Sequence, residues 1–509
     1  MKAETTKIFI PRTLLETGVD KDIELEGTLA DYLPGINRVV RTEANIYIDD
    51  TTIKGTKAEV RGKAVFALLY ESDYKSKLRC ERFTADFSHS FDIGETPEGE
   101  SIALTTGRCS YVSCKTLNPR RFILKCRADL GLKLRCMQGI SVISAADLKG
   151  AFFKTEGHRL SVLMTPIDKS FSLRETVSLE GMPPVGEIIY ASLCFAPAEH
   201  NLSEGSVLIH STAMLKCLYE EEGDEGALRY IERSFPVAFT VDSESLNGQC
   251  ELSAEICCTD CEVVKEMDGY GEMRVLSVNG NARVTLELLG SKDIELPIDL
   301  FFEEYESESK ADVLVAEKWE TQPRHRFSTE KLVEAPEFNA STIIATDGEI
   351  SVSEVTSESD EVWVSGVCAV SILGKGEDGV KAQDVTASFK ERLPLNSEKD
   401  CLINAKANML SAAAELRPDG RVSLRINAEL SLKTVKKERI TALTGAEINA
   451  RQGDEEDNVP LIIYYPDQGE TAWDIGKRYH RDPQAVISEN ADAFDKAEVV
   501  KAKGTILYM

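Results

Sequence analysis

The most chemically suggestive residues in this sequence are three clustered cysteines, Cys257, Cys258 and Cys261. Cys258 and Cys261 have the C-x-x-C spacing of one half of a zinc knuckle. No second C-x-x-C pair and no paired histidine completes a set of four ligands, since four residues separate Cys109 from Cys114. We therefore expect no metal and no cofactor. The thirteen cysteines, several at alternating positions in apolar stretches, are interpreted as reduced and packed thiols.

A catalytic site would need a nucleophile with a base, paired carboxylates or a metal cluster. The sequence contains no G-x-S-x-G, H-E-x-x-H, Walker A or G-x-G-x-x-G motif. Its six histidines are scattered singly: His89, His158, His200, His210, His325 and His480. Residues 220–222 are adjacent glutamates, which we interpret as the charged tip of a hairpin. We expect a protein that is not an enzyme, and a catalytic site assembled from loops is the more distant alternative.

The sharpest candidate for binding is a helix predicted over residues 471–480. Its apolar stripe follows the i, i+3, i+4, i+7 spacing of a face turned to a core: Ala472, Ile475, Gly476 and Tyr479. Trp473 lies off that stripe, on a neighbouring face with Lys477 and His480. Trp473 either covers the adjacent strand as a flank of the core or anchors a partner, since Trp is enriched at interface hot spots. Ile463, on the preceding strand, is the second apolar candidate for the partner-binding site, with burial in the core as its alternative.

The elements that must position these residues are mostly strands. Two landmarks recur at fixed offsets of 149 and 304 positions: an apolar pair at Val39, and an apolar run that ends near Tyr70. Apolar residues also alternate with polar ones near the end of each copy, a period of two that indicates half-buried strands. We predict a mainly β fold of three repeated antiparallel modules, sandwich-like or barrel-like, at residues 20–150, 165–310 and 330–448.

The segments around these modules differ in character. Residues 1–19 are assigned as an N-terminal extension, and the charged residues 303–310 as a solvated connection. Residues 449–459 are predicted to form an acidic linker. Residues 460–509 then predict a small α+β domain with the order strand, helix, helix, strand, whose second helix begins at Pro483 and ends at Glu489.

Length and charge limit the function further. The chain has 509 residues and a net charge of −27, from 59 Lys and Arg against 86 Asp and Glu. Such an acidic surface repels phosphate backbones and anionic lipid, so we expect no nucleic-acid partner and no membrane-surface binding. No apolar run approaches the about 18–20 residues of a membrane helix, and the run at residues 8–10 is too short for a signal-peptide core. We therefore expect a cytoplasmic protein.

Residues 465–479 (YPDQGETAWDIGKRY) resemble the LysM domain, with its strand, its Gly-acid-Thr turn and its W-x-I helix. Asn490 stands where that family has an Asn after its second helix, and Gly504 stands near its closing Gly. Ala472 replaces the usual Leu, and Lys503 replaces the Pro that often precedes the final Gly. The resemblance implies a βααβ fold for residues 460–509 and a ligand that is either glycan or protein.

The three β modules resemble the SPOCS domain of spore-coat-associated proteins, and their order before a LysM-like domain resembles the SipL-type spore-envelope morphogenesis family. That resemblance implies an adaptor in the mother cell, peripheral at the forespore surface and spore coat. Its partner would be the morphogenetic ATPase of the coat basement layer, bound through the LysM domain, with other coat proteins as additional candidates. The alternative is a LysM-mediated binder of peptidoglycan or chito-oligosaccharide in the cell wall or spore cortex.

Overall fold

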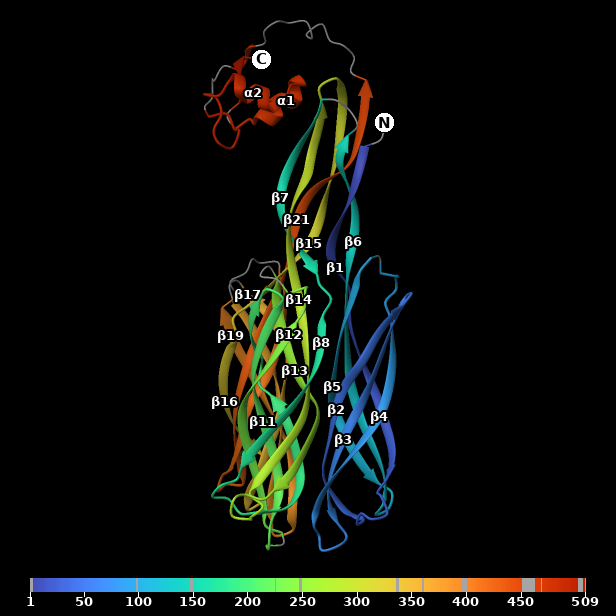
Figure 1. The fold of residues 1–509 in the computed structure, drawn as a ribbon, viewed down its shortest axis with the longest axis vertical. Coiled ribbons are helices and arrows are strands. Elements are labelled where there is room, and N and C mark those ends of the chain that lie inside the picture. Colours follow the sequence, from blue (N-terminus) through green and yellow to red (C-terminus); the bar gives the residue numbers. More distant parts are fainter. Residues whose placement is uncertain are drawn as a thin grey trace.

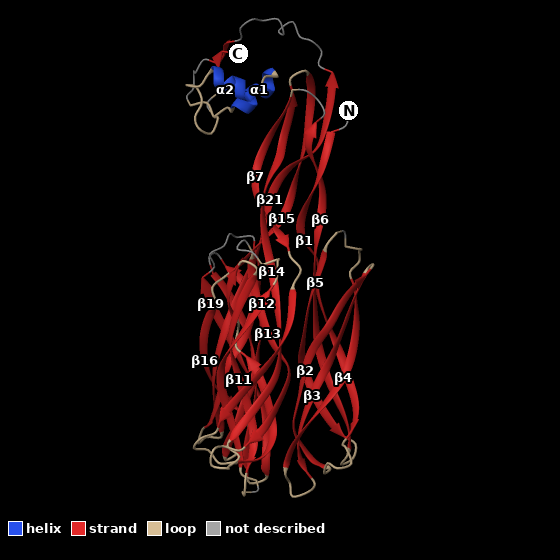
Figure 2. Ribbon diagram, in the orientation of Figure 1, coloured by secondary structure: helices blue, strands red, loops and turns tan. Residues whose placement is uncertain are grey.

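Three elongated β modules lie side by side and share one narrow stalk, and the C-terminal helices lie beside the tip of that stalk (Figure 1). The computed structural model describes residues 3–97, 99–146, 150–224, 226–246, 250–335, 338–358, 361–394, 401–450, 463–467, 469–501 and 507–508. Within these residues both helices belong to the C-terminal part of the chain, and the rest of the body is built from strands (Figure 2). The predicted mainly β fold class is confirmed.

The first β module is a sandwich of two antiparallel sheets, with strand orders β2-β3-β4 and β1-β6-β5. Its strands are β1 (Ala3–Thr28), β2 (Ile36–Lys54), β3 (Lys57–Ser72), β4 (Leu78–Asp92), β5 (Ser101–Thr116) and β6 (Arg121–Ala146). Alternate side chains of the two sheets, such as Phe66 and Leu124, are buried between them. The period of two in the sequence therefore corresponds to one buried face on each sheet.

The second and third β modules repeat this arrangement. The second contains β7 (Ala151–Leu163), β8 (Ile167–Ser178), β9 (Val185–Phe195), β10 (Glu199–Ser203), β11 (Ser206–Glu221), β12 (Leu228–Asp242), β13 (Glu251–Glu266) and β14 (Val275–Phe302). The third contains β15 (Tyr305–Thr321), β16 (His325–Glu334), β17 (Thr342–Glu358), β18 (Glu361–Gly376), β19 (Gly379–Pro394), β20 (Cys401–Leu416) and β21 (Arg421–Ala450). In each, a sheet centred on β11 or β18 faces a sheet centred on β14 or β21. The two sheets stay separate among the described residues, so of the two predicted alternatives, sandwich-like and barrel-like, the architecture is the sandwich.

The register of the strand pairs places the repeated landmarks at equivalent positions. Leu69 of β3 pairs with Arg41 of β2, and Leu218 of β11 pairs with Tyr190 of β9. In the third β module Leu373 of β18 pairs with Ala345 of β17. The three leucines pack together in one buried cluster where the modules meet, which we call the junction.

One glycine position shows how closely the neighbouring strands of one sheet pack around its central strand. A β-carbon added to Gly62 would collide with the Tyr47 carbonyl and the ring of Phe87. In the third β module Gly366 stands in the same relation to the Ser351 carbonyl and the ring of Phe389. The absence of a side chain here lets an aromatic ring lie directly over the backbone of the central strand.

The stalk consists of three two-stranded ribbons, one from each β module. β6, β14 and β21 continue beyond their sandwiches and pair there with the first half of β1, with β7 and with β15. The inward side chains form a continuous apolar core that includes Val142, Leu296 and Ile440. A ribbon of two strands cannot bury its own apolar face, so each ribbon depends on the other two.

The stalk changes the interpretation of residues 303–310. The charges there predicted a solvated connection, but residues 305–310 begin β15 and pair with β21, so that prediction is wrong. Alternating Glu and Ser suits a strand with one face in water, which a charge count alone does not distinguish from a linker. Residue 19 lies inside β1, which pairs with β6 along its length. The assigned module boundaries stay predictions.

The C-terminal module, residues 463–508, has the predicted order of strand, helix, helix and strand. It comprises β22 (Ile463–Tyr464), α1 (Ala472–Tyr479), α2 (Pro483–Glu489) and β23 (Leu507–Tyr508), and β22 pairs with β23. Its own small core contains Ala472, Ile475, Val486 and Phe494. Residues 451–459 of the predicted linker, and Lys503 and Gly504 of the predicted last loop, lie outside the described residues.

Candidate functional site

Helix α1 carries three of the four predicted binding residues and is fixed at both ends. The Thr471 hydroxyl accepts a hydrogen bond from the Asp474 backbone N–H, and the Asp474 carboxylate accepts one from the Thr471 N–H, forming a capping box. His480 ends the helix in the left-handed conformation at φ 54°. Ala472 and Ile475 face the core of the C-terminal module, which confirms the predicted stripe. Trp473, Lys477 and His480 are left on the neighbouring face.

Trp473 is only 9% exposed, yet it is not part of the core of its own module. Its ring lies edge-on to Phe301 of β14, with the ring centres 4.9 Å apart. Its indole Nε1–H donates a hydrogen bond of 3.0 Å to Oδ2 of Asp299, also on β14. The side chain is therefore buried against the stalk.

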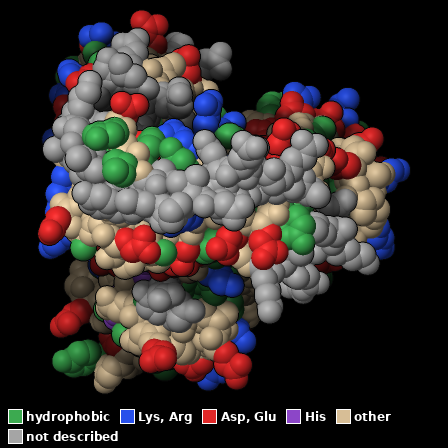
Figure 3. All heavy atoms as spheres, turned by 90° about the horizontal axis from the view of Figure 1, so that it is seen from above, with side chains coloured by type: hydrophobic (Ala, Val, Ile, Leu, Met, Phe, Trp, Pro, Cys, Tyr) green, Lys and Arg blue, Asp and Glu red, His purple; other side chains and the backbone are tan. Residues whose placement is uncertain are grey.

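Lys477 contacts the same carboxylate, one helical turn further along α1. Its Nζ lies 2.7 Å from both Oδ1 and Oδ2 of Asp299. Burial alone would raise the pKa of Asp299, but the hydrogen bonds from Lys477, Ser309 and Trp473 outweigh it and lower that pKa. Viewed from above, Lys and Arg side chains lie among Asp and Glu side chains over this end of the molecule (Figure 3). The contact between Lys477 and Asp299 therefore lies at an end of the molecule that carries side chains of both charges.

His480 completes the contact at the end of α1. Its Nδ1 lies 2.7 Å from the carbonyl oxygen of Phe302, the last residue of β14. Its Nε2 lies 3.3 Å from Oε1 of Glu306 on β15. Trp473, Lys477 and His480 thus all meet the tip of the stalk where β14 turns into β15. We call this connection the stalk hairpin; its two strands are hydrogen-bonded to β7 and to β21, respectively.

Ile463 lies apart from this group. It is on β22 and is 51% exposed, with no described contact to the stalk hairpin. Sequence reasoning missed Asp299, which lies 174 positions from Trp473. The available signal was a lone carboxylate inside the apolar run of residues 296–302, where a strand with two buried faces would not carry an unpaired charge.

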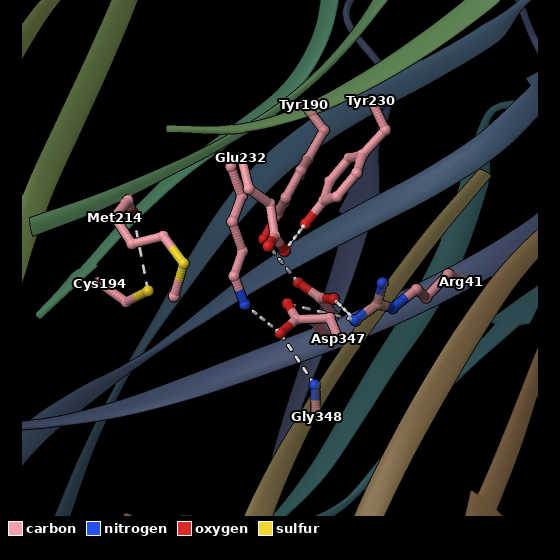
Figure 4. Close-up of polar contacts among 10 residues, drawn as sticks. Arg41, Tyr190, Cys194, Met214, Tyr230, Glu232, Asp347 and Gly348 are labelled. Carbon is pink, nitrogen blue, oxygen red and sulfur yellow. Dashed lines mark hydrogen bonds and ion pairs between the residues drawn. The ribbon is translucent and has the colours of Figure 1, made fainter. Parts of the chain in front are cut away.

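A second polar cluster occupies the junction, as Figure 4 shows. Arg41 of the first β module forms ion pairs with Glu43 and, at 3.8 Å, with Asp347 of the third. Tyr190 of the second donates a hydrogen bond of 3.1 Å to Glu43. Lys216, also of the second, lies 2.5 Å from Asp347. Side chains from all three modules therefore share one polar network.

Burial acts strongly on this junction network. It would lower the pKa of Arg41, but the carboxylates of Glu43 and Asp347 raise it. Burial, helped by Glu43, also raises the pKa of Tyr190 well above its ordinary value. An adjoining cavity of about 30 Å³, lined in part by Arg41, Tyr190 and Asp347, has room for one water molecule. The network is suited to holding the modules in one arrangement, and its cavity is too small for an organic ligand.

The clustered cysteines lie on β13 without forming a ligand set. Cys257 is exposed, Cys258 is half-buried and Cys261 is buried. All thirteen cysteines are free thiols. Among the described residues no group of three or more Cys, His, Asp or Glu side chains is placed to hold a metal ion. Residues 220–222 stand at the hairpin turn from β11 to β12, as predicted, but Glu220 itself is buried and pairs with Lys77 of the first β module at 3.2 Å.

Comparison with known proteins identifies part of the first β module. Residues 35–117 match the family model described as "SipL, SPOCS domain". These residues run from the start of β2 to the end of β5. The match supports a sporulation-related protein. No curated protein and no solved structure matches the chain. Neither helix in the described part of the chain is long and apolar enough to cross a membrane.

Proposed function

We propose that this protein is a non-enzymatic adaptor of spore-coat morphogenesis. It binds the morphogenetic ATPase of the coat basement layer through its C-terminal module and helps attach the coat to the forespore surface, on the mother-cell side. The observation that carries this proposal is the family match over residues 35–117. The LysM-like sequence of residues 465–479 adds a module whose ligand is protein or glycan.

The shape of the molecule is consistent with an adaptor. The three β modules and their stalk form one elongated body, and the C-terminal module sits at one end of it (Figure 1). The largest aromatic side chain on α1, Trp473, lies with Lys477 on a face that already contacts a protein surface. A few aromatic and charged residues commonly dominate such interfaces. We assign Trp473, Lys477 and His480 to the partner contact, with Ile463 as an additional apolar residue.

A peptidoglycan or chito-oligosaccharide ligand is the second candidate. Tyr465 is exposed in the loop between β22 and α1. In the LysM resemblance this loop and the last loop border the sugar groove. An exposed aromatic ring near that position is the observation that favours a glycan.

One experiment separates the two candidates. The full chain is titrated with the purified ATPase and, separately, with muropeptides. Trp473→Ala should weaken ATPase binding by about 2 kcal/mol, or roughly thirtyfold, and Trp473→Glu should weaken it more because the charge must be desolvated. Tyr465→Ala serves as the matched aromatic control and should leave ATPase affinity unchanged.

Thermal unfolding of each variant is measured beside its affinity. Normal unfolding with lost ATPase binding supports the anchor. If Trp473→Ala does not fold, Trp473 has a structural role. If the variant folds and its ATPase affinity is unchanged, the ATPase binds at another site. Saturable muropeptide binding without any ATPase binding would replace the adaptor with the glycan binder.

A further inference from the structure

The face of α1 that we assign to the partner is already occupied within the same chain. In the stalk hairpin, the ring of Phe301 covers Trp473, and the carboxylate of Asp299 accepts hydrogen bonds from Trp473 and Lys477. The carbonyl oxygen of Phe302 contacts the His480 ring. Three side chains on one face of α1 thus contact three groups of the stalk hairpin, namely an aromatic ring, a carboxylate and a backbone carbonyl. That combination resembles the contact that a bound protein strand would make.

The Asp299 carboxylate is held in place by the stalk hairpin itself. Its Oδ1 accepts hydrogen bonds from the Leu300 backbone N–H at 2.9 Å and from the Ser309 hydroxyl at 2.6 Å. Ser309 lies on β15, so both strands of the hairpin position the carboxylate. A preorganised acceptor loses little side-chain entropy when Lys477 and Trp473 bind it.

We propose that the stalk hairpin is an internal competitor for the partner-binding face of the C-terminal module. This inference rests on the proposed function. The external partner is then a protein segment of similar chemistry, which presents a carboxylate beside an aromatic or apolar side chain on an extended strand. The stalk hairpin and the partner segment exclude each other, because the carboxylates of both would have to occupy the same position beside Lys477. Their apolar side chains would likewise have to occupy the same position against Trp473.

Competition of this kind lowers the apparent affinity for the partner. The partner binds only the undocked fraction of molecules, so its apparent Kd is the intrinsic Kd divided by that fraction. Weakening the internal contact should therefore tighten partner binding. Coupling between two sites in proteins is commonly about 5- to 150-fold.

The first test measures docking without any partner. The full chain is labelled with ¹⁵N-tryptophan, which gives three indole N–H signals, and the Trp473 signal is assigned with Trp473→Phe. In Asp299→Asn this signal should move and its exchange with water should become at least tenfold faster. The matched control is Glu304→Gln, which removes a charge from an exposed carboxylate in the same turn and should change neither property.

The second test measures affinity of the same proteins for the basement-layer ATPase. Asp299→Asn should bind roughly tenfold more tightly than the wild type, and Glu304→Gln should match the wild type. Ser309→Ala, which loosens Asp299 without altering any group that contacts α1, should lie between them in both tests. Unfolding midpoints within about 1 °C of the wild type in this variant would show that the stalk is intact.

The outcomes distinguish the two proposals. An unchanged Trp473 signal in Asp299→Asn overturns the internal competitor, whether or not the ATPase binds. A changed signal with unchanged or weaker ATPase affinity also overturns it, because docking would then not compete. A changed signal with no ATPase binding by any protein, wild type included, supports the docking and overturns the proposed function. If the protection of the Trp473 indole N–H from exchange with water rises with protein concentration, the stalk hairpin that covers Trp473 belongs to a second copy of the chain. That result overturns the internal contact.

Discussion

The carboxylate of Glu287 in the second β module lies 2.6 Å from Nη1 of Arg135 in the first, although 152 positions separate the two residues. Lys433 of the third β module places its Nζ 2.6 Å from the other carboxylate oxygen. Arg135 is only 6% exposed, and this carboxylate helps to compensate its buried charge. Side chains from three modules with similar backbones thus meet at one point, where two cations and one anion make their mutual arrangement specific.

Replacing Glu287 with Gln should destabilise the whole three-module body. The buried Arg135 charge loses its carboxylate, and breaking a buried pair of this kind costs about 3–5 kcal/mol. Partial exposure of Lys433 lowers the expected cost to about 2 kcal/mol, measured by urea unfolding of the full chain. The control is Glu330→Gln, which breaks the exposed pair with Arg425 and should cost under about 1 kcal/mol. Equal effects of the two substitutions would contradict the role of the buried triad.

Acid should weaken the same contact. Burial alone would raise the pKa of Glu287, but Lys433 and Arg135 outweigh it and hold that pKa below its ordinary value of 4.5. A carboxylate whose pKa is lowered by folding adds stability above its ordinary pKa, and this stability is lost as the pH falls through the folded-state value. Between about pH 5 and pH 3 the free energy of unfolding should therefore fall more steeply in the wild type than in Glu287→Gln. Parallel pH profiles would rule out this linkage.

The junction offers a test of how far the modules depend on one another. Leu218 on β11 is 2% exposed and packs against Leu69 and Leu373 of the other two modules. Leu218→Ala should cost about 2–5 kcal/mol through lost burial and the resulting cavity. Leu208→Ala on the same strand, where the side chain is 37% exposed, should cost under about 1 kcal/mol. Urea unfolding followed by circular dichroism measures both, and similar losses would mean that the junction is loosely packed.

Thiol reactivity should follow local environment rather than cysteine count. Burial raises the pKa of Cys217 to about 12, whereas a hydrogen bond from Cys126 lowers the pKa of half-buried Cys109. The thiolate is the reactive form, so iodoacetamide at pH 8 should modify Cys109 well before Cys217 in the native protein. Peptide mass spectrometry gives the order of labelling. In denaturant the two rates should become equal, and early labelling of Cys217 in the native state would contradict the burial argument.

Local patterns predicted the elements of this fold closely. The alternation that predicted strands reflects a sheet with one buried face, a property of each strand and its immediate neighbours. The second helix begins at Pro483 and ends at Glu489 as predicted, because a proline and a capping aspartate, Asp482, set its start locally. The charged residues 303–310 failed as a predicted linker, because charge alone does not distinguish a linker from an exposed strand in a stalk.

The candidate site shows more clearly which features local sequence predicts and which depend on the tertiary structure. The spacing of Trp473, Lys477 and His480 follows helical periodicity, so the sequence by itself determined that they lie on one face of α1. Only the tertiary structure decided what they meet, because Asp299 and the stalk hairpin belong to a distant part of the chain. The polar networks at Glu287 and Arg41 were equally invisible in the sequence. Periodicity reports which side of an element is buried, whereas the identity of the covering surface depends on how the three modules and the C-terminal module pack.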